Sequence, residues 1–141
     1  MTYAAQADLV ERYGSDELIQ LTDRATPSSG AIDAGVVTAA LTDADAEINS
    51  YIRTKVATPV VPVPGILVQM ACAIARYRIW KDRASEKVTQ DYKDAIAWCK
   101  GVARGDIALG DATSSIDAPS AGAPQVSQGC SRFNDDTLRD F

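Results

Sequence analysis

The chain has 141 residues, of which 46% are hydrophobic and 23% are charged, a composition typical of one globular domain with a single core. Its 14 basic and 19 acidic residues give a formal net charge of −5, and it contains no histidine. The missing histidine excludes Ser-His-Asp and Cys-His catalysis and most zinc or non-haem iron sites, so we expect no enzyme and no cofactor. We also expect a cytosolic protein without a membrane partner, because the sequence shows neither a spanning apolar run nor a secretory signal.

Two short helices are predicted at the N-terminus. Thr2 is suited to cap the first, which carries Leu9 and which Gly14 would end in the left-handed conformation. Ser15 is suited to cap the second, whose first turn is acidic, as the helix dipole favours. The composition of residues 26–30 then predicts a loop.

The first long helix is expected to begin at Asp33 and to run to about Lys55. Apolar residues recur in it at spacings of three and four, the stripe of a helix buried on one side: Val37, Leu41, Ala44, Ile48 and Tyr51 or Ile52. The alternating acids Asp43, Asp45 and Glu47 do not fit a calcium loop, because such positions fan around a helix axis. A solvated acidic face is the preferred interpretation.

Residues 58–65 contain three prolines, cannot be helical, and are predicted to form a stiff extended connector. Pro64 is suited to open the second long helix, which should run to about Arg83. This helix has the broad apolar face of a central helix, made of Ile66, Leu67, Met70, Ala73, Ile74, Tyr77 and Trp80. Cations gather towards its C-terminal end and form a candidate basic interface or channel face: Arg76, Arg78, Lys81 and Arg83.

The third long helix is expected to open at Ser85, continue to about Arg104 and stop at Gly105. Its stripe is made of Val88, Tyr92, Ala95, Cys99 and Val102, with Trp98 at the border of the buried face. No Cys-x-x-Cys motif is present, so we interpret the thiols of Cys72 and Cys99 as small hydrophobic groups. Cys130, in the polar tail, has no assigned role.

Between residues 112 and 131, 13 of 20 residues are Ala, Ser, Pro or Gly, which cannot bury enough apolar surface to offset the entropy of ordering. The last nine residues then contain three apolar anchors, Phe133, Leu138 and Phe141. A tether that finishes in such anchors indicates a partner-binding arm, the alternative being a disordered end with incidental aromatic residues. The predicted organisation is an all-α bundle over residues 1–110, with two short and three longer helices, followed by an extended C-terminal arm over 111–141.

Charge is unevenly distributed, with a net −7 in residues 1–50, +6 in 51–104 and −4 in 105–141. An acidic segment of one subunit could therefore meet the basic segment of a neighbour. The basic segment could instead contact nucleic acid, or the charges could pair within one chain on solvated faces. Sequence-specific DNA recognition is not expected, because a helix-turn-helix over residues 3–23 would be acidic.

Four stretches carry a family resemblance when they are taken in order. They are residues 3–14 (YAAQADLVERYG), 62–80 with PVP and MACAIARYRIW, 92–110 with YKDAIAW and GDIALG, and 132–141 (RFNDDTLRDF). Together they resemble the small head–tail connector (adaptor) proteins of Mu-like tailed bacteriophages and prophages.

The resemblance implies a structural virion protein of the phage neck. It would form a ring of twelve copies of itself beneath the portal protein, extend the DNA channel, and support head completion and tail attachment. The implied partners are further copies, the portal protein and the next neck or tail-completion protein, with non-specific contact to channel DNA. The implied location is the virion neck, and the host cytoplasm during assembly. The alternative is a small helical nucleic-acid- or protein-binding module with a non-structural role.

Overall fold

The computed structural model describes residues 2–24 and 26–109, which lie in the helical part of the predicted organisation. Throughout these residues the fold is all-α, as predicted, and no strand occurs in them. No helix in the described ranges is both long and apolar enough to cross a membrane. The elements are α1 (Gln6–Tyr13), α2 (Ser15–Thr22), α3 (Ala34–Ile52), α4 (Gly65–Trp80), the 3-10 turn η1 (Lys81–Arg83) and α5 (Glu86–Arg104).

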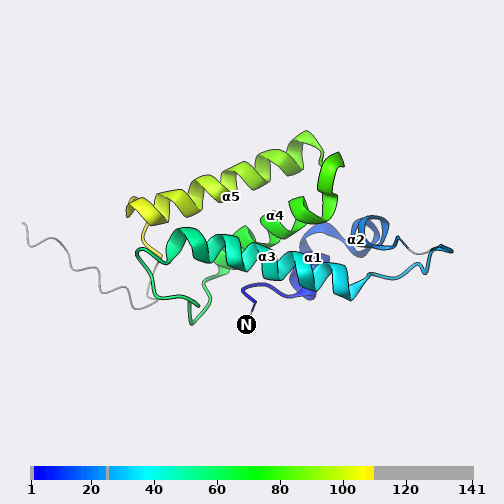
Figure 1. Ribbon diagram of the computed structural model, residues 1–141, viewed down its shortest axis with the longest axis horizontal. Helices are drawn as coiled ribbons and strands as arrows, with labels where there is room; N and C mark the ends of the chain where they lie inside the picture. Colours follow the sequence, from blue (N-terminus) through cyan, green and yellow to red (C-terminus); the bar gives the residue numbers. More distant parts are fainter. Residues whose placement is uncertain (1, 25, 110–141) are drawn as a thin grey trace, which may run out of the picture.

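Helix α4 is the centre of the bundle, as its broad apolar face predicts. It packs against α3 on one side and α5 on another, and α1 and α2 contact it as well (Figure 1). The core is one contiguous cluster, and its largest fully buried aliphatic side chains come from every helix and from the connector: Leu9, Leu18, Val37, Ile48, Ile52, Val60, Leu67, Ile74, Ile79 and Val102. The two short helices are therefore part of the same core as the three long ones.

Three predicted helix ends are confirmed by their hydrogen bonds. The Asp33 carboxylate caps α3 and accepts the N–H groups of Gly35 at 2.8 Å and Val36 at 3.2 Å. Ser85 caps α5, and its hydroxyl oxygen accepts the N–H of Val88 at 3.3 Å. Gly105 ends α5 in the left-handed region with a φ of 88°, which glycine adopts without steric cost.

The predicted N-caps of the two short helices are wrong, whereas Gly14 does end α1, with a φ of 86° but an extended ψ of 153° in place of the left-handed conformation. Helix α1 begins at Gln6, so Thr2 lies too far upstream to cap it, and Ala5 occupies the N-cap position. The missing cap is replaced by Asp8, whose carboxylate accepts the Ala5 N–H at 2.7 Å. Gly14 is the N-cap of α2, and Ser15 is its first helical residue. A direct α1–α2 junction leaves no separate residue for a serine cap.

The ends of α3 and α4 also differ from the prediction. Helix α3 ends at Ile52, and residues 53–55 form a turn. Pro64 precedes α4 as its N-cap, because its ψ of 144° is extended and the helix begins at Gly65. At the other end, α4 stops at Trp80, because Lys81 adopts a φ of 53°. The predicted last turn is therefore the separate element η1, which leads the chain into α5.

The connector is non-helical, as predicted, but it is bent and not extended. Bends occur at residues 58–59 and 61–62, on either side of Val60. Val60 is buried in the core and its N–H donates to the Tyr3 hydroxyl oxygen at 3.2 Å, whereas Val61 is 60% exposed. The hydrogen bond to Tyr3 and the burial of Val60 draw the middle of the connector inward.

The buried part of α4 is wider than the predicted stripe and is centred differently. Ile66 was expected on the apolar face but is 40% exposed, and Tyr77 and Trp80 are half-buried. Since four helices contact α4, its buried arc includes the small residues of its middle turns: Ala71, Cys72, Ala73 and Ala75. Alanine at these positions permits close packing of the neighbouring helices.

Candidate interaction surfaces

Arg76, the first residue of the predicted basic face, is neutralised inside the subunit. Its guanidinium donates to both carboxylate oxygens of Glu17, from Nε at 2.7 Å and from Nη2 at 2.9 Å. The indole N–H of Trp80 donates to the same carboxylate at 3.1 Å. The guanidinium also lies 4.3 Å from the centre of the Tyr13 ring and 3.8 Å from an oxygen of Asp91. Arg76 thus joins α1, α2 and α5 to α4.

Arg78 is paired in a second network, with acids of α3. Its Nη2 donates to Glu47 at 2.7 Å, and Asp43 lies 3.7 Å away. The Tyr92 hydroxyl donates to the other oxygen of Glu47 at 2.8 Å, and its ring stacks on Tyr77 with centroids 4.3 Å apart. Burial, reinforced by the hydrogen bond to Glu47, raises the pKa of Tyr92 to about 12. Glu47 therefore connects α3 to both α4 and α5.

Asp45 is buried beneath the N-terminal segment, so the predicted solvated acidic face is wrong at this position. It is 7% exposed, and its two oxygens accept the Tyr3 N–H at 3.1 and 3.2 Å. Burial raises the pKa of Asp45 to about 6. The Tyr3 hydroxyl in turn donates to Asn49 and accepts the Val60 N–H, so this tyrosine ties the N-terminus to α3 and to the connector.

The four cations do not form one surface. Arg76 is half-buried and Arg78 is 39% exposed, and both pair with carboxylates of their own subunit. Lys81 and Arg83 are exposed on η1 and make no ion pair with any side chain that the structure describes. An interface role stays a prediction, and it now rests mainly on these two residues. The predicted arm anchors Phe133, Leu138 and Phe141 lie outside the described residues.

Two cysteines behave as predicted. Cys72 on α4 and Cys99 on α5 are free and fully buried, and burial raises the pKa of each thiol to about 11. Since the thiolate is the reactive form, neither side chain is suited to nucleophilic chemistry. Cys130 lies outside the described residues. No group of three or more His, Cys, Asp or Glu side chains in the described ranges could hold a metal ion.

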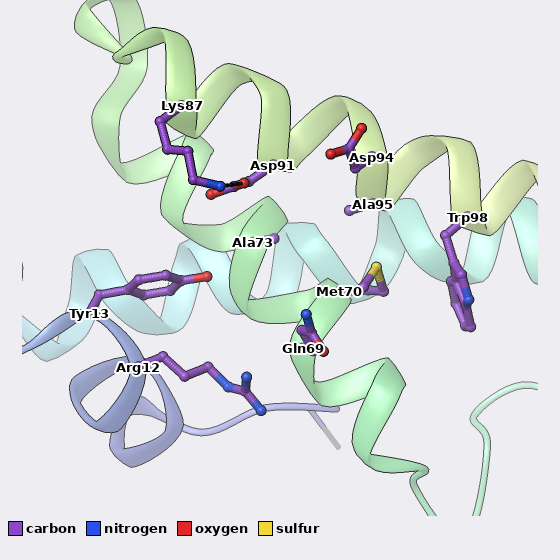
Figure 2. Close-up of a pocket in the computed structure, with 10 residues that line it drawn as sticks. All are labelled: Arg12, Tyr13, Gln69, Met70, Ala73, Lys87, Asp91, Asp94, Ala95 and Trp98. Atoms are coloured by element: carbon purple, nitrogen blue, oxygen red, sulfur yellow. Dashed lines mark hydrogen bonds and ion pairs between the residues drawn. The ribbon is translucent and has the colours of Figure 1, made fainter.

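The sequence did not reveal a groove that runs between α1, α4 and α5 (Figure 2). It encloses about 520 Å³ and is lined by Arg12, Tyr13, Gln69, Met70, Ala73, Lys87, Asp91, Asp94, Ala95 and Trp98. The small side chains of Ala73 and Ala95 leave the space open at its base. Trp98 was predicted at the border of the buried face of α5, and the structure confirms that it is half-buried. This position was the sequence feature that pointed to the groove.

Comparison with known proteins points to Mu-like phages. The chain matches the family model described as "Bacteriophage Mu, Gp36" over residues 3–128. It is 37% identical over 108 residues to the Mu-like prophage FluMu protein gp36 of Haemophilus influenzae, covering 77% of this chain and 75% of that protein. It is 32% identical over 105 residues to gene product J of Escherichia phage Mu, covering 74% of each. The family match includes the first three stretches of the resemblance and ends before the fourth, residues 132–141.

Proposed function

Because the chain belongs to the Mu-like phage protein family described as Bacteriophage Mu, Gp36, we propose that it is a head–tail connector of the phage neck. In this role, copies of the chain form a ring, of twelve subunits on the family resemblance, beneath the portal protein. The ring extends the DNA channel and offers a surface to the next neck or tail-completion protein. The observation that carries the proposal is the family membership, which extends over most of the chain.

The internal ion pairs support a role as a rigid building block. Glu17 with Arg76, and Glu47 with Arg78, join α2 and α3 to the central helix through charge-assisted hydrogen bonds of 2.7–2.9 Å. Such bonds are roughly twice as strong as neutral ones and hold the helices in a fixed geometry. A ring subunit needs this property, because small changes of shape accumulate around a closed ring.

The charges left over after internal pairing support a head-to-tail contact. Arg53, Lys55 and Lys100 are exposed near the C-terminal ends of α3 and α5, and in the described ranges they make no ion pair. The two helix ends are adjacent, since a Cβ at Gly105 would lie 3.9 Å from the Lys55 side chain. Helix α2, with its exposed Asp16, lies at the opposite end of the bundle (Figure 1). A contact between Asp16 of one subunit and Lys55 of the next would be heterologous, as a ring requires, while Lys81 and Arg83, which also lie at the α2 end, stay outside this pairing.

Complementation of heads tests the proposed function. Heads would be purified from a Mu-like phage in which the gene for this chain carries a stop codon, and mixed with tails with or without the purified protein. We expect DNA-filled heads that join tails only after the protein is added, and rings at the portal vertex by electron microscopy. Efficient head–tail joining without the protein would refute the proposal.

The alternative, a nucleic-acid-binding module, has a different signature. Binding of the isolated protein to duplex DNA would weaken steeply with salt, because cations that contact phosphates displace counterions. Lys81→Glu and Arg83→Glu would abolish such binding, while Lys93→Glu, an exposed site on the middle of α5, serves as the matched control. Strong DNA binding that these variants remove, together with normal head–tail joining, would favour the alternative.

A further inference from the structure

We propose that, in the free subunit, the groove between α1, α4 and α5 binds residues 131–141 of the same chain. This inference goes beyond the connector role, because it concerns the subunit before any partner is present. The segment lies outside residues 3–128, the range that the family model matches, so the inference does not rest on the family match.

The groove has the chemistry of an apolar anchor site with a polar rim. Met70, Ala73 and Ala95 form its base, and the half-buried ring of Trp98 stands beside it, pointing from α5 towards the α4 side (Figure 2). The Lys87–Asp91 ion pair lies on the rim. Methionine adapts to partner shape and tryptophan offers a large apolar face with a polar edge, and both are common in binding surfaces. A volume of about 520 Å³ accommodates more than one large side chain.

The segment supplies matching anchors. Both phenylalanines of the chain, Phe133 and Phe141, lie in it together with Leu138. Leu138 and Phe141 are three residues apart in the sequence; in a segment that becomes helical on binding, this spacing would put both side chains on one face. The segment also carries aspartates at positions 135, 136 and 140. Arg12 lines the groove and interacts with the Cys72 side chain, but it makes no ion pair with any described side chain, so its charge can still meet one of these acids.

The tether is long enough for docking within one subunit. Leu109 is buried, 3% exposed, and fixes the last described part of the chain beside the C-terminal end of α5. The 23 residues 110–132 follow it, and a flexible chain of that length has a root-mean-square span of roughly 26 Å. Ala95 lies only about 15 Å along the helix from Gly105, at 1.5 Å per residue. Within one chain the segment is therefore present at a millimolar effective concentration.

Photo-crosslinking of the full-length protein tests the inference. A benzophenone amino acid would replace Phe141 in one variant and Ser120, in the tether, in a control variant. We expect the probe at position 141 to label peptides that contain Met70 or Trp98 at least about tenfold more than the probe at 120. Labelling that is spread over the surface, or centred on Val61 and Ile66, would overturn the proposal.

Amide spectra of the full-length protein give a second, non-covalent readout. A variant with Phe133→Ser, Leu138→Ser and Phe141→Ser should shift the signals of residues around Met70 and Trp98, whereas the tether control with Ile116→Ser and Val126→Ser should not. Unchanged groove signals in the anchor variant would contradict the proposal. Docking in one subunit also requires shifts that do not depend on protein concentration; shifts that grow with concentration would assign the groove to the segment of a second copy and overturn the intramolecular form.

Discussion

Asp45 makes the stability of this fold depend on pH in a direction opposite to that of most carboxylates. Its folded-state pKa of about 6 lies above the ordinary value of 3.8, because the side chain is buried. Between these two values the unfolded chain loses the proton while the folded chain keeps it. Folding therefore binds a proton, and the contribution of Asp45 to stability falls as pH rises through this window.

The size of the effect follows from the two pKa values. At 1.36 kcal/mol for each pKa unit, the difference of about two units corresponds to a loss of ~3 kcal/mol between pH 3 and pH 7, about half of which has developed by pH 5. The loss is a large fraction of the 5–15 kcal/mol that typically stabilises a domain. Ionised Asp45 retains the hydrogen bond from the Tyr3 N–H, which limits the loss and does not abolish it.

Asp45→Asn isolates this contribution, since an asparagine oxygen still accepts the Tyr3 N–H but the side chain does not titrate. The free energy of unfolding would be measured in urea at pH values from 3.5 to 7.5 for both proteins. We expect the variant to gain ~3 kcal/mol relative to the wild type across this range. Asp43→Asn, 62% exposed and two residues away, is the control for losing one negative charge from α3, with an expected change below about 0.5 kcal/mol. A difference between wild type and Asp45→Asn that does not vary with pH would refute the argument.

The remaining predictions concern three other points of the bundle, each measured by urea denaturation. A double-mutant cycle with Glu17→Ala and Arg76→Ala should give a coupling free energy of about 1–3 kcal/mol. If the two losses of stability simply add, the Glu17–Arg76 ion pair does not stabilise the fold. Gly105→Ala should cost ~1 kcal/mol because φ is 88° there, and a loss as large for Gly105→Asn would argue against backbone strain as the cause. Ile48→Ala should cost about 2–5 kcal/mol and Ile48→Val about 0.5–1.5, because the side chain is fully buried; equal losses would contradict a packing origin.

The helices were predictable because their signals are local. The apolar spacing of α3 and the caps at Asp33, Ser85 and Gly105 act within one or two turns, and the structure confirms them. The failures at Thr2 and Ser15 have a common cause, since many residues can cap a helix and the choice depends on where the chain enters the fold. Here Tyr3 is fixed by Asp45 and Asn49, which moves the start of α1 to Gln6.

The interaction surfaces were less predictable because they depend on contacts between distant residues. Arg76 and Glu17 are 59 positions apart, and no sequence pattern indicates that they meet. Asp45 did carry a signal, because it lies four residues after Leu41 and three before Ile48, on the buried stripe of α3. The alternation of Asp43, Asp45 and Glu47 favoured a solvated acidic face, but the position of Asp45 on the apolar stripe is what determines its burial.

Pairing within the subunit reduces the charge that is left for contacts between subunits. The hydrogen-bonded ion pairs of Arg76 and Arg78 are made within the subunit, so these charges are already partnered before a neighbour arrives. What remains for a head-to-tail contact is exposed charge such as Lys55 and Asp16, and exposed pairs contribute roughly 0–1 kcal/mol each. A single contact between two free subunits is therefore weak. The proposed ring would accordingly depend on closure and on the portal as a template, and the free protein should sediment as a monomer at low micromolar concentration.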